Sequence, residues 1–92
     1  MEDSSIPNIT NLKDERVFEN IFRLYYKQLV AFAHKYVSDS QLAEKLVQEM
    51  FTNLWHKAYN IEIRTSIKSH LYGSARNACL NYIKHKNVEK KY

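Results

Sequence analysis

The chain has 92 residues, a length that fits one small domain. One glycine and one proline are too few for the tight turns of β-sandwiches and barrels, so an all-α fold is favoured. A single cysteine excludes an intrachain disulfide, and no apolar run approaches the roughly 20 residues that span a bilayer. The polar, acidic N-terminus is unlike a signal peptide, so we expect a cytoplasmic protein without membrane insertion.

Positive charge is concentrated in the last third of the chain. Residues 1–60 carry seven Lys/Arg and eight Asp/Glu, whereas residues 61–92 carry seven Lys/Arg and two Asp/Glu. A basic third on a near-neutral body is typical of a protein that binds a polyanion. A solvated basic tail gives the same composition, so charge alone leaves both interpretations open.

The first predicted helix follows an irregular lead-in over residues 1–13, which contains Pro7 and shows no periodicity. Asp14 is the candidate N-cap of a helix of about 23 residues. The motif "SDS" at residues 38–40 interrupts the helix, and either Ser38, paired with Gln41, or Asp39 caps the next one. The apolar stripe of the first helix comprises Phe18, Ile21, Phe22, Tyr25, Leu29, Phe32, Ala33 and Tyr36.

The second predicted helix ends near Tyr59 and has its own apolar stripe. Phe51 and Trp55 widen this stripe, and core packing is the favoured role for both of these aromatic residues, as it is for Phe18, Phe22 and Phe32. The stripe itself comprises Ala43, Leu46, Val47, Met50, Leu54 and Ala58.

Residues 60–66, "NIEIRTS", show no helical stripe and are predicted to form a loop. Thr65 or Ser66 is the candidate N-cap of the third helix. Gly73 lies inside this helix, where glycine costs about 1 kcal/mol relative to alanine, and we expect it to permit close approach of a neighbouring helix. The third stripe comprises Ile67, Leu71, Ala75, Ala78 and Tyr82, with Tyr72, Cys79 and Ile83 beside it.

Three amphipathic helices with short connections predict a compact antiparallel three-helix bundle, with room for a short fourth helix. We expect the helical domain to cover residues 14–88 and residues 89–92 to form a frayed basic tail.

The sequence contains no pattern that predicts catalysis, a metal site or a cofactor. None of the four histidines pairs with another histidine or with cysteine at metal-ligand spacing. His85 and Glu89 lie one helical turn apart, but two potential ligands make a weak site. Cys79 falls on an apolar stripe, which favours burial over nucleophilic chemistry.

Polar residues of the third helix avoid its apolar stripe and should be exposed. Lys and Arg neutralise phosphates, and Asn and Arg offer paired donors to base edges, so nucleic acid is the favoured partner over an ordinary solvated face. Tyr59, Tyr72 and Tyr82 occur among these residues and are candidates for stacking on bases. The exposed polar set comprises Lys68, Arg76, Asn77, Asn81 and Lys84.

Two stretches, "LAEKLVQEMFTNLW" and "SIKSHLYGSARNACLNYIKHK", together resemble region 2 of bacterial RNA polymerase sigma factors. The resemblance is greatest to the extracytoplasmic-function type and covers about residues 15 to 88. It implies a sigma region 2-like fold and a role in transcription initiation that involves no covalent catalysis.

The resemblance also implies a protein partner for the second helix, which in this family docks on the coiled-coil clamp helices of the polymerase β′ subunit. Lys45 stands where the family usually carries Asp or Glu, which removes an attraction to a basic clamp residue. The polymerase-binding residues implied in this way are Lys45, Gln48, Glu49, Asn53 and His56.

The third helix and the loop before it resemble the segment that recognises and melts the minus-ten promoter element. The loop around residues 61–65 would help to hold a flipped base of the non-template strand. The DNA-binding residues implied are Arg64, Thr65, Lys68, Arg76, Asn77, Asn81 and Lys84.

A helical protein-interaction adaptor with an incidental basic tail is the alternative. A sigma domain predicts that Gln48 and Glu49 lie on a different face from Arg76 and Lys84, open to two partners at once. We further expect a monomer, a fragment of a longer two-domain factor, and an anti-sigma factor as a further candidate partner.

Overall fold

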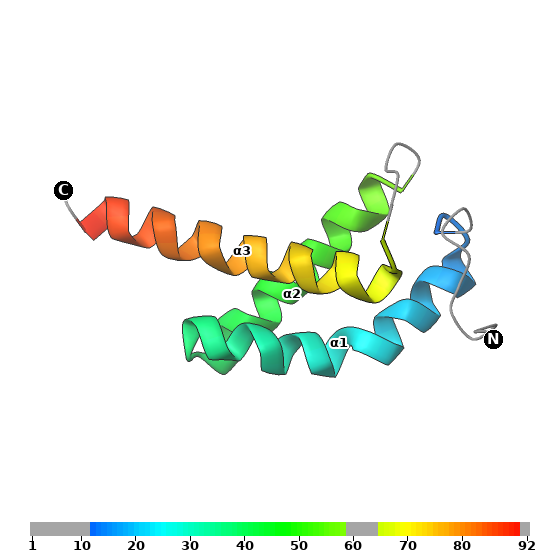
Figure 1. The fold of residues 1–92 in the computed structure, drawn as a ribbon, viewed down its shortest axis with the longest axis horizontal. Coiled ribbons are helices and arrows are strands. Elements are labelled where there is room, and N and C mark those ends of the chain that lie inside the picture. Colours follow the sequence, from blue (N-terminus) through cyan, green and yellow to red (C-terminus); the bar gives the residue numbers. More distant parts are fainter. Residues whose placement is uncertain (1–11, 59–64, 91–92) are drawn as a thin grey trace.

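The computed structural model describes residues 12–58 and 65–90, with side chains up to residue 87. Three helices form the described part: α1 (Glu15–Val37), α2 (Ser40–His56) and α3 (Ile67–Lys90). The chain reverses direction between successive helices, and each helix packs against the other two (Figure 1). This confirms the predicted all-α three-helix bundle, and the described residues contain no fourth helix.

Helix α1 has the predicted N-cap and the predicted length. The Asp14 carboxylate accepts a hydrogen bond from the Arg16 backbone N–H at 2.9 Å, which satisfies a donor of the first turn. The helix runs for 23 residues to Val37, and its C-cap is Ser38, whose φ of 55° and ψ of 33° lie in the left-handed region. The Ser38 N–H donates to the His34 carbonyl at 2.8 Å, so this residue closes the last turn of α1.

Asp39 caps α2, because its carboxylate accepts a hydrogen bond from the Leu42 N–H at 3.0 Å. Of the two caps that the sequence allowed, Asp39 fills this role and Ser38 ends α1 instead. Two residues therefore reverse the chain, which holds α1 and α2 side by side. Helix α2 ends at His56, and Tyr59, where we expected its end, lies outside the described residues.

Ser66 caps α3, since its hydroxyl oxygen accepts a hydrogen bond from the Ser69 N–H at 3.0 Å. The helix continues for 24 residues to Lys90 and so passes residue 88, where we had placed the end of the domain. Within the described residues, no helix combines the length and the apolar character that a membrane crossing requires.

The core consists of the apolar stripes of the three helices, and the described residues bury no polar or charged side chain in it. Leu12 also belongs to the core, although it precedes the predicted N-cap. Cys79 is fully buried, as predicted, and burial raises the pKa of its thiol. The buried residues are Leu12, Ile21, Leu29, Ala33, Ala43, Leu46, Val47, Met50, Phe51, Leu54, Ile67, Leu71, Ala75 and Cys79.

Gly73 does not mark a close helix–helix approach, and our expectation for it was wrong. The residue is exposed on α3, its φ is not positive, and a Cβ added to it would meet no atom within 4 Å. Nothing in the described fold therefore requires glycine at this position, and the cost of its backbone entropy is not offset by packing.

We expect Gly73→Ala to raise the free energy of unfolding by about 1 kcal/mol, because alanine restricts the unfolded chain and clashes with nothing. The melting temperature should rise by roughly 4–8 °C, measured by circular dichroism. The reverse change at an exposed alanine of α1, Ala31→Gly, is the matched control and should lower stability by a similar amount. A melting temperature that falls in Gly73→Ala would show that the glycine is needed.

Candidate functional site

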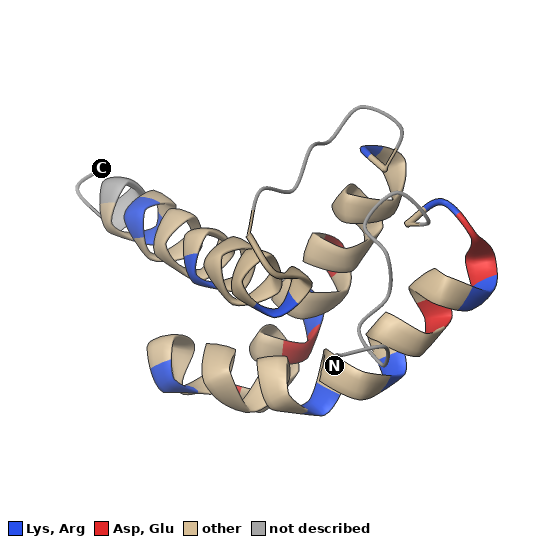
Figure 2. Ribbon diagram, turned by 45° about the vertical axis from the view of Figure 1, so that its right-hand side comes forward, with Lys and Arg blue, Asp and Glu red and all other residues tan. Residues whose placement is uncertain are grey.

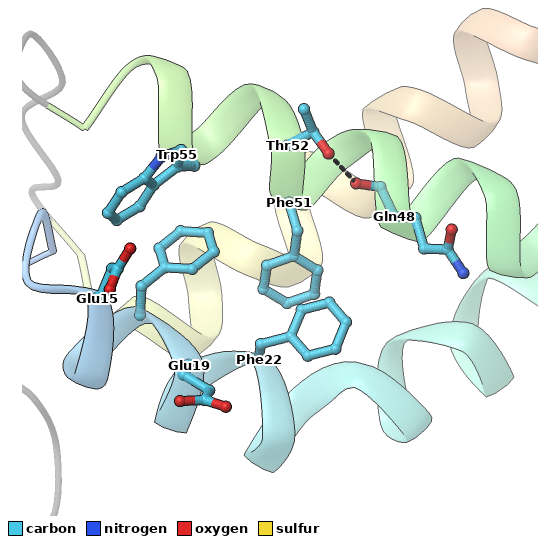
Figure 3. A pocket seen from close by; sticks show the side chains of 8 residues that line it. Glu15, Glu19, Phe22, Gln48, Phe51, Thr52 and Trp55 are labelled. Carbon is cyan, nitrogen blue, oxygen red and sulfur yellow. Dashed lines mark hydrogen bonds between the residues drawn. The ribbon is translucent and has the colours of Figure 1, made fainter.

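An aromatic groove of about 560 Å³ lies between the first half of α1 and the second half of α2 (Figure 3). Four aromatic residues from the two helices line it, and their rings contact one another. The ring centres of Phe18 and Trp55 are 5.0 Å apart, and those of Phe22 and Phe51 are 4.9 Å apart. We had predicted these rings to be core residues, and Phe51 is buried. Phe18 and Phe22 are half-buried and pack against the core, and together with the half-buried Trp55 they open into the groove.

Polar residues complete the lining of the aromatic groove. Gln48 is held in place from α1, because its amide nitrogen donates a hydrogen bond to the Tyr26 hydroxyl at 3.0 Å. One turn further on, the Thr52 hydroxyl donates to the Gln48 carbonyl at 3.0 Å (Figure 3). Two carboxylates from α1, those of Glu15 and Glu19, also line the groove. The groove thus combines an apolar surface with acidic and amide groups.

A second hollow, which we call the polar cleft, lies between α2 and α3 and has a volume of about 530 Å³. Helix α2 contributes Glu49 and Asn53 to its polar lining, and Lys57, the C-cap residue directly after the helix, also lines it; each of these side chains is exposed. Apolar side chains of both helices form the remaining surface. The residues contributed by α3 are His70, Ser74, Asn77, Ala78, Asn81 and Tyr82, and the apolar residues of α2 are Leu46, Met50 and Leu54.

The predicted polymerase-binding residues are all exposed on α2, but they do not form one patch. Gln48 lines the aromatic groove, facing α1. Glu49 and Asn53 line the polar cleft, facing α3, whereas Lys45 and His56 line neither. Glu49 shares the cleft with Asn77 and Asn81 of α3, whereas Arg76 and Lys84, from which we expected it to lie apart, do not line this cleft.

Of the predicted DNA-binding residues, all those that the structure describes are exposed. Asn77 and Asn81 line the polar cleft, and Lys84 lies one turn beyond Asn81 on α3. Residues 65–87 contain no Asp or Glu, so the charged side chains that this part of α3 itself carries are all Lys or Arg (Figure 2). The remaining described residues of this set are Thr65, Lys68 and Arg76, and Arg64 lies outside the described residues.

The tyrosines proposed for base stacking have different environments. Tyr72 packs on α1, because its hydroxyl donates to the Gln28 side-chain carbonyl at 3.2 Å and its ring meets Phe32 at 4.9 Å. Tyr82 is half-buried in the polar cleft, and Tyr59 lies outside the described residues. Of the two described tyrosines, Tyr82 is therefore the better placed to meet a base.

Sequence reasoning missed Lys57, His70 and Ser74 as cleft residues. The available signal was a four-residue spacing, which is typical of residues on one side of a helix. This spacing relates Glu49, Asn53 and Lys57. Among the residues described, no three His, Cys, Asp or Glu side chains come together in a way that could hold a metal ion.

His70 should make the domain less stable in mild acid. Burial lowers its pKa below the ordinary value of 6.5, so the folded domain resists a proton that the unfolded chain accepts. Stability is then fully present above pH 6.5 and falls as the pH drops below it.

Urea unfolding at about pH 7.5 and about pH 5.5 measures this effect, and His70→Gln should lose less stability between the two than the unchanged domain. His34→Gln, at an exposed position on α1, is the control and should lose as much as the unchanged domain. Equal losses in all three proteins would show that His70 does not titrate as described.

Comparison with known proteins gives a family for this chain. Neither the curated proteins nor the solved structures gave a match. The sequence does match the family described as sigma-70 region 2 over residues 21–88, about three quarters of the chain. This family acts in transcription initiation with RNA polymerase and promoter DNA, and it is not a family of enzymes. The exposed basic helix and the all-α bundle agree with the match, and the chain therefore belongs to the sigma-70 region 2 family.

Proposed function

We propose that this domain connects RNA polymerase to promoter DNA during initiation. Helix α2 docks on the clamp helices of the β′ subunit, and α3 with the loop before it binds and opens the minus-ten element. One observation carries the proposal beyond the family match: α2 has an aromatic groove on one side and a polar cleft on the other. Two partners can therefore be held at the same time.

The aromatic groove suits the docking of a protein helix. Half-buried aromatic rings provide a large apolar contact area, and such residues dominate the binding energy of protein interfaces. Gln48 is already fixed by Tyr26, so little side-chain freedom is lost when it meets a partner. Lys45 and His56 are exposed on the same helix and remain in the proposed docking surface as its outer residues.

Helix α3 suits a strand of DNA. Lys68, Arg76 and Lys84 are exposed and can neutralise phosphates, while Asn77 and Asn81 offer amides to base edges. Opening a duplex requires a few kcal/mol for each unstacked base, which contacts to the separated strand can offset. The loop around residues 61–65, including Arg64, stays in the proposal on sequence resemblance.

The same resemblance supports finer proposals about this protein. It is an extracytoplasmic-function sigma factor domain, it works as a monomer in the cytoplasm, and an anti-sigma factor would control it by covering the surfaces named above. The alternative, a helical adaptor that binds protein only, predicts that the cations of α3 are dispensable for every partner.

Docking is tested by Gln48→Lys. A lysine at this position places a positive charge at the aromatic groove, so we expect affinity for core polymerase to fall by about tenfold. The measurement is co-purification followed by titration with labelled domain. The same change at an exposed glutamine of α2 outside the groove, Gln41→Lys, is the control and should bind normally. Equal affinities of the two variants would remove the groove from the docking surface.

DNA binding is tested by replacing Arg76 and Lys84 with Ala. If each contacts a phosphate, affinity for single-stranded minus-ten DNA falls, and the slope of log affinity against log salt drops by about 1.4 in magnitude. Fluorescence anisotropy at several salt concentrations measures both. Removing one Arg and one Lys from α1, at Arg16 and Lys27, is the matched control. A slope that changes equally in both double variants would mean that only net charge matters and would favour the adaptor.

A further inference from the structure

The aromatic groove between α1 and α2 carries a free negative charge. Of its eight lining residues none is Lys, Arg or His, and two are acidic, Glu15 and Glu19. The Glu19 carboxylate is already paired, because the Arg23 guanidinium lies 2.9 Å from it. In the described part of the chain, Glu15 makes no hydrogen bond or ion pair through its side chain, so this carboxylate is available to a partner.

Aromatic rings lie beside the free carboxylate. Glu15 and Trp55 occupy the same end of the groove, and Gln48 lies at the other end (Figure 3). The ring of Phe18 meets that of Trp55 edge to face at 5.0 Å, and both rings are half-buried. Because the face of an aromatic ring is electronegative, the rings and the carboxylate attract the same kind of group, a cation.

We propose that this end of the aromatic groove receives an arginine side chain of the protein that docks on α2, with its guanidinium stacked on Trp55 and paired with Glu15. The inference rests on the proposed function and deepens it, because it names the chemistry of the partner residue. It also adds the first turn of α1 to a docking surface that the sequence resemblance assigned to α2. Glu15 and Phe18 precede residue 21, where the family match begins, so the match does not cover this part of the groove.

Arginine suits the groove better than lysine does. A guanidinium is planar and more weakly hydrated than an ammonium, so it stacks on an aromatic face while its N–H groups still donate to a carboxylate. Thr52 offers a further acceptor, since its hydroxyl donates its own proton to the Gln48 carbonyl at 3.0 Å and keeps its lone pairs free. The groove volume of about 560 Å³ leaves room for a side chain that lies along the rings.

The fluorescence of Trp55 tests the site directly, because this residue is the single tryptophan of the chain and lines the groove. Argininamide is the probe, and citrullinamide, in which a neutral urea of the same shape replaces the guanidinium, is its matched control. Argininamide should change the emission saturably, with a dissociation constant in the millimolar range, and lysinamide should bind more weakly. A response to argininamide that does not saturate, or that citrullinamide reproduces, would overturn the inference.

Glu15→Gln removes the free charge and keeps the size of the side chain. We expect its affinities for argininamide and for core polymerase each to fall by about fivefold. Glu44→Gln, at an exposed carboxylate of α2 outside the groove, is the control and should bind argininamide normally. Circular dichroism checks that both variants are folded, since a negative charge in the first turn of α1 also favours the helix.

The outcomes separate the inference from the function on which it rests. Unchanged polymerase affinity in Glu15→Gln, together with weaker binding of Gln48→Lys, overturns the inference and leaves the proposed docking in place. Unchanged polymerase affinity in both variants overturns the two together. Weaker binding of argininamide to Glu15→Gln, with normal binding of polymerase, would show that the docked protein does not use this site and would equally overturn the inference.

Discussion

The burial of one apolar stripe of α2 between α1 and α3 decides how the rest of this domain is arranged. Six residues of α2, five of the stripe and Phe51 beside it, are buried, and the helix packs on both of its neighbours. The core holds no polar side chain among the described residues. The polar side chains of α2 therefore project from the helix on either side of the buried stripe. Of these, Gln48 and Thr52 line the aromatic groove beside α1, and Glu49 and Asn53 line the polar cleft beside α3.

Most of the fold follows from local patterns that the sequence shows directly. Helix periodicity identified all three helices and their buried faces, and short polar side chains marked the caps at Asp14, Asp39 and Ser66. The choice between Ser38 and Asp39 was not visible, because it depends on Ser38 adopting a left-handed backbone conformation that is uncommon for residues other than glycine. Gly73 was misread for a similar reason, since a helical pattern does not show whether a neighbour is close.

The candidate site was less predictable than the fold, because both of its hollows lie between helices. Exposure of Gln48, Glu49, Asn77 and Asn81 follows from their positions on the stripes, but their grouping depends on how α2 is turned relative to its neighbours. Adjacent residues of a helix point about 100° apart, so Gln48 and Glu49 reach different partners although they are consecutive. A family resemblance that assigns residues by position along one helix does not contain this information.

The burial of Cys79 makes the domain convenient for site-directed labelling. It is the one cysteine of the chain, it is fully enclosed, and its raised pKa keeps little of the reactive thiolate at neutral pH. A maleimide dye would therefore react with a cysteine introduced on the surface and leave the native one intact. A dye placed beside either hollow, paired with a second dye on the polymerase or on the DNA, would report by energy transfer which partner approaches that hollow.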